Sequence, residues 1–488
     1  MPPIVVNLAA SLLSRATCAG CLLSLPWLLS ACLGTAHVGS VPQPPLPDTF
    51  SHVHLNAHNA PERWWSLLDD PDLDGVIAAA LDDNLDLRTY WERLLQAEAT
   101  LDQAASARWP SLDAQASVGR AHSGGARGAV TQNNFQVSAA ASYEVDLWGK
   151  VAAQIAAAEL EREAVADMAH AAAMTLVAQV TEAWLDVRYQ RARRALRQQQ
   201  IDIASTYLDL VRLRFAMGQA SALDVLQQQQ QLESLQSQLV PVDTQDFLAR
   251  LRLAVLLGRA QAIDVPAHLD QLPLPDPALH LGAPQDLLQH RPELRAARRR
   301  VEAADARIIV AMADRLPTLR LSASLMLAAT APLDLLDQLF WSLGATLGGP
   351  VFDGGRRAAE LSRTHSVWRE RVYAYAHAIL VALEEVERSH ALCEVQRQLL
   401  DDLDLQLNTA SLALHMAREQ FLGGITDYSR VITALAALQQ LQLSRLDIHR
   451  QYLSYWVQRF RALGGAWVPP RPDLEAHPMT LSRGQGAP

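Results

Sequence analysis

The chain has 488 residues, of which half are hydrophobic, and a formal net charge of −10 at neutral pH. This length allows two or three domains with sizeable cores, and the acidic balance argues against a nucleic-acid partner because binding phosphates requires a basic surface. Alanine, leucine, glutamine and arginine are abundant and only 6% of residues are aromatic, which favours long, closely packed helices.

The N-terminus has the pattern of a secreted lipoprotein. An apolar stretch over about residues 16–31 ends in Leu29-Ser30-Ala31-Cys32. Cleavage before Cys32 would free its amine for acylation and its thiol for a diacylglyceryl group. The following residue is Leu33 rather than aspartate, which is typical of lipoproteins that are sorted to the outer membrane. We therefore expect residues 1–31 to be a signal peptide and residues 32–62 a lipid-anchored tether, the alternative being a plain signal peptide with an incidental cysteine.

Few residues offer disulfide or metal chemistry. After cleavage Cys393 is the one cysteine besides Cys32, so the sequence provides no disulfide framework. His52, His54 and His58 have a spacing that suits a metal ion. Because they fall in the loose N-terminal segment, neither a metal site nor a cofactor other than the covalent lipid is predicted.

The rest of the chain repeats itself about 207 residues later. The first copy of the match contains Leu87, Arg88, Ala97, Arg108, Pro110, Leu112 and Ser117, and the second contains Leu294, Arg295, Ala304, Arg315, Pro317, Leu319 and Ser324. The offset falls to 206 further on, where Val145, Gly149, Phe215 and Gly218 match Val351, Gly355, Phe421 and Gly424. Such a repeat indicates a duplicated unit whose two copies are related by a pseudo-symmetry axis. We assign residues 63–259 and 290–466 to the two repeats, residues 260–289 to a linker and residues 467–488 to a tail.

Each repeat begins with a helix of about twenty residues. These helices cover Leu87 to Arg108 and Leu294 to Arg315, and Pro110 and Pro317 follow them because proline cannot continue a helix. The next residues alternate between apolar and polar, which predicts β-hairpins at about 111–146 and 318–352. Strands of about ten residues with one apolar face are long enough to cross a bilayer when tilted. The alternative is a half-buried sheet in a soluble protein.

A very long helix is predicted after each hairpin. Gly149 and the pair Gly354-Gly355 mark tight turns, and the helical stretches that follow reach Phe215 and Phe421. About 65 residues of helix span roughly 100 Å, too long for a compact domain. No run after the signal reaches 18 apolar residues, so these helices should lie in water. The chain turns back at Gly218 and Gly424, and the glutamine run 227–231 is interpreted as a polar helix face.

Four strands per chain cannot close into a barrel. In lipid, an open sheet edge leaves backbone groups unsatisfied at several kcal/mol each, so several chains must share one barrel. Two chains would give eight strands and a filled interior, whereas three would give twelve and a lumen. A transport pore favours the trimer.

Several motifs together resemble the TolC-like outer membrane efflux proteins, in particular the NodT-type lipoprotein branch. The motifs are Leu29-Ser30-Ala31-Cys32, Tyr143-Glu144-Val145-Asp146-Leu147-Trp148-Gly149-Lys150, Gly218-Gln219-Ala220-Ser221-Ala222-Leu223-Asp224-Val225, His290-Arg291-Pro292-Glu293-Leu294-Arg295, Phe352-Asp353-Gly354-Gly355-Arg356 and Ala462-Leu463-Gly464-Gly465-Ala466-Trp467. The resemblance covers the chain from Cys32 to about Trp467. It implies a mainly helical fold with a small strand part, in which a homotrimer forms a twelve-stranded outer-membrane barrel continuous with a periplasmic helical tunnel. It also implies a periplasmic adaptor and an inner-membrane pump as partners, commonly of the resistance-nodulation-division type.

The same resemblance implies a gate where the tunnel narrows at its periplasmic tip. Asp224 matches the family's tip aspartate, and trimer symmetry would make it a ring of three carboxylates able to favour cations. Arg430 occupies the equivalent position in the second repeat, where relatives often carry an acidic residue, and Asp427 lies three residues earlier. Our hypothesis is that an aspartate–arginine contact holds the tip closed; otherwise all three are exposed turn residues.

The sequence shows no H-E-x-x-H, P-loop, G-x-S-x-G or spaced cysteine motif, so we predict no enzymatic activity. The main interpretation is a passive outer-membrane exit duct for drugs or other small toxic compounds, driven by an inner-membrane pump. The alternative is a periplasmic coiled-coil lipoprotein with structural or adaptor duties. The alternating hairpins distinguish the two, because an adaptor has no need of lipid-facing strands.

Overall fold

The structure, a computed structural model, describes residues 41–50, 63–125, 128–265, 271–275, 283–464, 467 and 469. The chain divides into a unit of residues 1–41 and a unit of residues 42–488, and every described helix and strand belongs to the second unit. The predicted signal peptide, Cys32 and the three N-terminal histidines lie outside the described residues.

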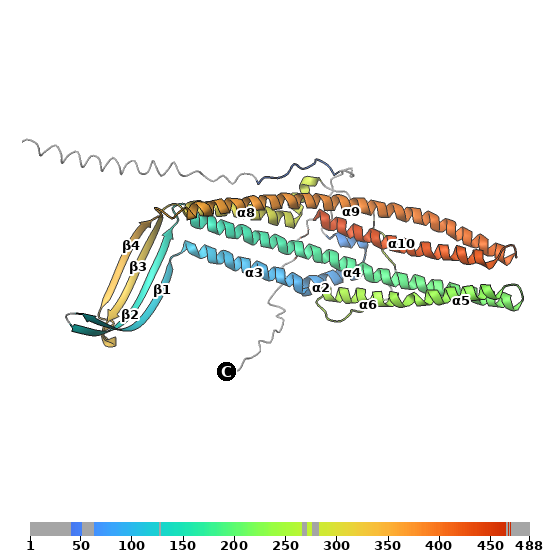
Figure 1. Cartoon of the computed structure of the whole chain (residues 1–488), viewed down its shortest axis with the longest axis horizontal. Helices are drawn as coiled ribbons and strands as arrows, with labels where there is room; N and C mark the ends of the chain where they lie inside the picture. Colours follow the sequence, from blue (N-terminus) through green and yellow to red (C-terminus); the bar gives the residue numbers. More distant parts are fainter. Residues whose placement is uncertain are drawn as a thin grey trace, which may run out of the picture. The chain divides into compact units, whose positions relative to one another are not determined.

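Both repeats contain, in the same order, a helix of about twenty residues, a β-hairpin, a very long helix and a return segment of one or two helices (Figure 1). The first contains η1 (Trp64–Leu68), α2 (Pro71–Asp83), α3 (Leu85–Ala105), η2 (Ser106–Arg108), β1 (Ser111–Gly125), β2 (Gly128–Val145), α4 (Lys150–Ala216), α5 (Ala222–Ser237) and α6 (Leu239–Leu256). The second contains η3 (Pro284–Asp286), α7 (Leu287–His290), α8 (Pro292–Ala313), β3 (Thr318–Ala329), η4 (Pro332–Asp334), β4 (Leu339–Gly348), α9 (Arg356–Leu422) and α10 (Tyr428–Leu463). The mainly helical fold with a small strand part is confirmed, and α4 and α9 have 67 residues each.

The four strands form one antiparallel sheet in the order β1-β2-β3-β4. Each repeat contributes a hairpin, and β2 pairs with β3 to join the repeats. The expected strand length of about ten residues was wrong for the first hairpin, because β1 has 15 residues and β2 has 18. Residues 119–134 are mostly small or polar, so the alternation that marks a strand fades although the backbone pairing continues.

The helices before the hairpins end sooner than predicted. Helix α3 stops at Ala105 and tightens into a 3-10 turn, while α8 stops at Ala313. Trp109 precedes Pro110 and is extended (φ −115°, ψ 152°), as expected for a residue before proline. The extended Trp109 therefore ends the 3-10 turn immediately before Pro110.

The return helix of the first repeat is divided, unlike its counterpart. Helix α5 ends at Ser237 and α6 begins at Leu239, whereas α10 runs unbroken for 36 residues. Pro241 lies in the first turn of α6, where its missing N–H costs no helical hydrogen bond. In a continuous helix its ring would clash with the Ser237 carbonyl, which explains the division.

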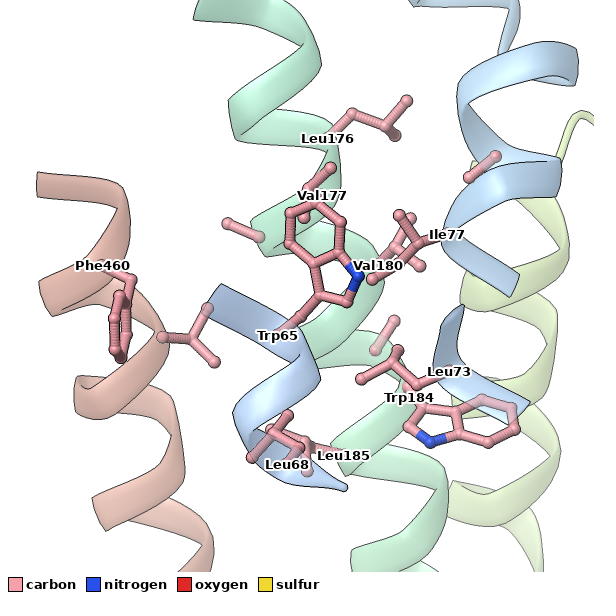
Figure 2. Packing of buried hydrophobic residues seen from close by; sticks show 14 of the residues in the cluster. Trp65, Leu68, Leu73, Ile77, Leu176, Val177, Val180, Trp184, Leu185 and Phe460 are labelled. Atoms are coloured by element: carbon pink, nitrogen blue, oxygen red, sulfur yellow. The ribbon is translucent and has the colours of Figure 1, made fainter. Parts of the chain in front are cut away.

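The largest core lies where the N-terminal elements pack against α4 and α10 (Figure 2). Trp64 stacks on Phe460 with ring centroids 5.3 Å apart. Trp184, Leu73 and Leu185, which Figure 2 labels, are fully buried. Each such side chain contributes about 1.5–3 kcal/mol by leaving water. This core fixes the N-terminal elements against the middle of the long helices.

A buried carboxylate completes the attachment of the N-terminal elements. Asp70 caps α2 by accepting from the Leu73 amide at 3.2 Å. Its Oδ2 also accepts from Trp184 Nε1 at 2.7 Å and Arg188 Nη1 at 2.6 Å. One side chain therefore caps a helix and binds it to α4. Within the described residues, no helix combines the length and apolar character needed to cross a membrane.

Candidate functional site

The two turns that end the long helices share one geometry, and in Figure 1 they lie at the end of α4 and α9 away from the sheet. After α4, the amides of Gly218 and Gln219 donate to the carbonyls of Phe215 and Arg214 at 2.9 and 2.8 Å. After α9, Gly424 and Ile425 donate to Phe421 and Gln420 in the same pattern, at 3.1 and 2.9 Å. This is the Schellman motif, which requires a left-handed residue, and φ is +74° at Gly218 and +73° at Gly424.

The next helix starts differently in the two repeats. Ser221 and Asp224 form a capping box: the Ser221 amide and hydroxyl donate to Asp224 Oδ2 at 2.8 Å, and the Asp224 amide donates to Ser221 Oγ at 3.2 Å. In the second repeat Asp427 is the cap residue, without a side-chain cap bond, and the exposed Arg430 takes the place of Asp224. A carboxylate in the first turn suits the helix dipole, whereas an arginine there opposes it.

The predicted gate residues are therefore close to helix starts but not joined to one another. In the part of one chain that the structure describes, the Asp224 carboxylate bonds to Ser221, and no ion pair links Asp224 or Asp427 to Arg430. A ring of carboxylates or an aspartate–arginine contact between neighbouring chains stays a prediction.

A buried hydrogen bond connects the two helical turns, and the sequence interpretation missed it. The Tyr428 hydroxyl on α10 donates to Gln228 Oε1 on α5 at 2.9 Å, and Gln228 Nε2 donates to the Ala204 carbonyl on α4 at 2.8 Å. Both side chains are buried, with 1% and 0% exposed. The interpretation of the glutamine run as a polar face was thus wrong for Gln228. Burial, with smaller effects from Tyr207 and Asp224, raises the pKa of Tyr428, so its hydroxyl keeps its proton.

A second contact lies beside that bond. The Arg214 guanidinium of α4 lies 4.4 Å from the Phe421 ring centroid and its Nη1 donates to the Phe421 carbonyl at 3.3 Å. The Phe421 ring packs on Tyr428 with centroids 5.1 Å apart. The two repeats are therefore joined at the tip by the Tyr428–Gln228 hydrogen bond and by the hydrogen bond and cation–aromatic contact that Arg214 makes with Phe421.

Polar contacts continue along the line where α4 faces α10. Gln200 Nε2 donates to the Gln439 carbonyl at 3.3 Å and to Gln442 Oε1 at 3.2 Å. The Tyr189 hydroxyl donates to Asp447 at 2.5 Å, and burial together with that carboxylate raises the pKa of Tyr189 to about 12. Further along, Arg450 Nε donates to Asp186 at 2.7 Å. Side-chain hydrogen bonds rather than an apolar core alone thus hold the two repeats together here.

At the other end of the long helices, tight turns connect them to the sheet. The Asp146 carboxylate accepts from the amides of Val151 and Ala152 at 3.1 and 2.9 Å, so it caps α4. Gly149 has φ +70°, its counterpart Gly355 has φ +88° and the neighbouring Gly354 has φ +64°, a conformation that favours glycine.

The repeats are also joined at this junction. Trp148 Nε1 donates to the Pro317 carbonyl at 2.6 Å, and Lys150 Nζ lies 2.9 Å from Asp314. Among the residues that the structure describes, no group of three histidine, cysteine, aspartate or glutamate side chains is placed to hold a metal ion.

Comparison with known proteins identifies the fold and its duplication. Residues 76–259 and 283–465 match the family described as outer membrane efflux protein. The chain belongs to this family. The family membership predicted from the motifs is confirmed, and the two matched segments correspond to the two repeats of this efflux protein.

Individual relatives align with the efflux protein over nearly their whole length. The pyoverdine export outer membrane protein OpmQ of Pseudomonas aeruginosa is 31% identical over 467 residues, covering 92% of this chain and 98% of that protein. The outer membrane protein OprJ of the same organism is 30% identical and covers 87% and 91%. A solved structure of the outer-membrane channel OprN is 25% identical with a TM-score of 0.79 and covers 89% of this chain and 100% of that chain.

Proposed function

We propose that three copies of this chain form the outer-membrane channel of a tripartite efflux pump, a passive duct for drugs or other small toxic compounds. The observation that carries the proposal is the continuity of a four-stranded sheet with two 67-residue helices in a member of the efflux family. The sheet supplies a membrane part and the helices supply a periplasmic tunnel. OpmQ is named for pyoverdine export, which supports a small molecule as cargo.

The sheet of one chain has the surface of a membrane segment. Trp341, Leu343 and Leu347 of β4 are 71%, 75% and 67% exposed, and Leu112 and Val118 of β1 are 75% and 77% exposed. Apolar side chains in water are unfavourable by about 25 cal/mol per Å², so lipid is the better neighbour. The exposed apolar strands count against a periplasmic coiled-coil or adaptor protein, because such a protein needs no lipid-facing sheet.

Three chains close the sheet with a lumen. Three sheets of four strands give a twelve-stranded barrel, larger than the eight-stranded barrels that side chains fill. The same symmetry places three copies of Asp224, Asp427 and Arg430 around the tip, where we infer the gate. We also infer a periplasmic adaptor and an inner-membrane pump of the resistance-nodulation-division type as partners, since a passive duct needs an energy source.

The proposed anchoring at the outer membrane depends on Cys32. We infer removal of residues 1–31, acylation of Cys32 and a tether over residues 32–62, because the Leu29-Ser30-Ala31-Cys32 motif matches lipoprotein processing. The repeats over 63–259 and 290–466 then hold the channel itself, with residues 260–289 as the linker and residues 467–488 as the tail.

The test uses the full chain in a host that lacks its own efflux channel. Outer membranes are run on gels with and without heating, cells are labelled with palmitate, and resistance to toxic compounds is measured with a matching adaptor and pump. We expect a heat-labile trimer, a label that Cys32→Ser abolishes, and restored resistance. A monomer in the soluble periplasmic fraction would refute the proposal.

A further inference from the structure

Four helices beside the sheet line one hollow. Helix α4 packs against both α3 and α8, and α8 packs against α9, so the four helices lie in a row next to the sheet (Figure 1). The hollow has a volume of about 610 Å³ and is lined by residues of all four helices. Neighbouring helix axes lie about 8–10 Å apart, so the two ends of a flat row would be roughly 25–30 Å apart, too far to share a hollow of this size. The row therefore curves, and the hollow lies on its concave face.

The hollow opens on the side that we infer to be the lumen. Asp314 lines the hollow and lies 2.9 Å from Lys150 Nζ, which in turn lies 3.6 Å from Glu144. Glu144 stands opposite Arg320 on the polar face of the sheet, at 3.7 Å. In a membrane barrel with an apolar outer surface, this polar face lines the interior. A closed ring of such helical layers also encloses its concave side, so the sheet and the helices indicate the same side.

Both repeats contribute equivalent positions to the hollow, but the residues there differ in charge. The offset of 207 relates α3 to α8, and the offset of 206 relates α4 to α9. The neutral residues of the first repeat correspond to charged residues of the second, namely Thr100 to Arg307, Gln154 to Glu360 and Ala157 to Arg363, and all six line the hollow. The charges are therefore a feature of this site and not of the repeated scaffold.

The hollow combines an apolar wall with a charged rim. Small apolar side chains, among them Ala157, Ala304 and Ala311, are buried in its wall. Its charged lining residues are three arginines and three carboxylates, namely Arg162, Arg307 and Arg363 with Glu161, Asp314 and Glu360. Small-molecule sites typically have volumes of about 300–1,000 Å³ and a mostly apolar lining with a few polar groups. The hollow therefore has the size and the composition of a binding site for a small molecule.

The rim is neutral as a whole, and its charges are held in ion pairs at the surface. Arg307 lies 3.3 Å from Glu161, and Arg363 lies 2.6 Å from Glu360. These four side chains are 37–66% exposed, so each pair contributes little to stability and a ligand can replace one partner. A ligand with one net charge is attracted by one half of the rim and repelled by the other. A ligand with a positive and a negative group gains from both halves.

We propose that this hollow binds zwitterionic amphiphilic compounds as they pass through the duct, an inference that rests on the proposed function. The apolar body of the compound lies on the alanines, its cationic group contacts Glu161 or Glu360, and its carboxylate contacts Arg307 or Arg363. One charge-assisted hydrogen bond of this kind is enough for roughly tenfold in affinity. Because the hollow is open to the lumen and its ion pairs are exposed, the bound compound exchanges rapidly, as conduction requires.

Three fluorescent derivatives of one compound test the charge preference. A piperazinyl fluoroquinolone is a zwitterion at neutral pH, its methyl ester is a cation and its N-acetyl derivative is an anion. Fluorescence anisotropy measures their binding to trimers of the full chain in lipid nanodiscs, with empty nanodiscs as the blank. We expect the zwitterion to bind about tenfold more tightly than either derivative. Equal binding of the three, or tighter binding of a derivative, overturns the inference.

A substitution that fills the hollow tests the position of the site. Ala158→Phe places a large side chain in the hollow, whereas Ala156→Phe places the same side chain on an exposed part of α4 that does not line it. Ala158→Phe should abolish the tighter binding of the zwitterion, and Ala156→Phe should leave it unchanged. An unchanged affinity in Ala158→Phe, at the same trimer level, places the binding elsewhere and overturns the inference.

Charge reversal on the exposed rim tests the chemistry without altering the core. Arg363→Glu gives the neutral rim an excess of two negative charges and should raise the ratio of cation to anion affinity by about tenfold. Arg388→Glu is the matched control, because Arg388 is also 66% exposed and paired with a glutamate of α9 but does not line the hollow. The same ratio in both variants overturns the inference.

Trimer formation and resistance separate a failure of the channel from a failure of the site. A chain that forms no heat-labile trimer, or that restores no resistance with a matching adaptor and pump, refutes the channel itself. A trimer that restores resistance but binds the three derivatives equally refutes only the zwitterion site.

Discussion

Replacing Tyr428 with phenylalanine should loosen the helical tip. The variant keeps the ring but loses the hydroxyl that donates to Gln228 Oε1 at 2.9 Å, in a contact where 1% of Tyr428 and none of Gln228 is exposed. An unsatisfied buried acceptor costs about 1–3 kcal/mol. If opening the tip separates α10 from α5, the variant loses that energy only in the closed state. The ratio of closed to open forms should then fall roughly 5- to 150-fold for each chain.

The assay is entry of a dye or bulky antibiotic that an intact outer membrane excludes, measured at equal trimer levels. Tyr207→Phe is the matched control, because Tyr207 packs against the same cluster and its hydroxyl makes no hydrogen bond with any described residue. Adding Gln228→Leu to Tyr428→Phe removes the orphaned acceptor and should restore part of the barrier. Entry no faster than in the parent chain would refute the reasoning.

Three further predictions test the helical body. Gly149→Ala should destabilise the protein by about 1–2 kcal/mol, because φ is +70° at Gly149. Gly75→Ala, inside α2 and with open space around it, should stabilise the protein by about 0.5–1 kcal/mol. Urea unfolding measures both free energies, and equal effects of the two substitutions would contradict the argument. Burial lowers the pKa of His449, although the hydrogen bond to the Pro273 carbonyl acts in the opposite direction. The contribution of neutral His449 to the free energy of unfolding is therefore complete above about pH 6.5 and is lost as the pH falls. His449→Gln should therefore flatten the decline in unfolding free energy between pH 7 and 5, by at most about 1.4 kcal/mol per pH unit, and an unchanged slope would count against this role. Asp167→Asn weakens the ion pairs of Arg295 and Arg299 with a carboxylate that is 8% exposed, and should lower the stability by about 1–3 kcal/mol. Asp243→Asn, in an exposed ion pair, should lower the stability by less than about 1 kcal/mol. Thermal unfolding of the two variants measures the difference.

Features that depend on neighbouring residues were predictable from the sequence. The 65-residue helical stretches and the turns at Gly149, Gly218 and Gly424 follow from local periodicity and from backbone angles that glycine adopts most easily. Strand alternation indicated which face of each hairpin is apolar. It did not indicate the full length of β1 and β2, because their outer residues are small or polar.

The partners of individual side chains were not predictable in the same way. Gln228 and its neighbours in the glutamine run look alike in sequence, yet Gln228 alone of the run accepts the Tyr428 hydroxyl. Asp224 looked like a gate charge, and in one chain it caps its own helix. The Tyr428–Gln228 bond depends on the rotation of one helix against another that lies 200 residues away, which periodicity alone does not specify, whereas the Asp224–Ser221 contact is local.

By itself, the sequence determined the duplication, the hairpin and long helix of each repeat and the apolar face of every hairpin, since these depend on composition and spacing within one segment. The tertiary structure alone decided that β2 pairs with β3, that Tyr428 binds Gln228 and that Arg299 pairs with Glu163. Those contacts join distant segments, and their geometry is set by how whole helices and strands pack.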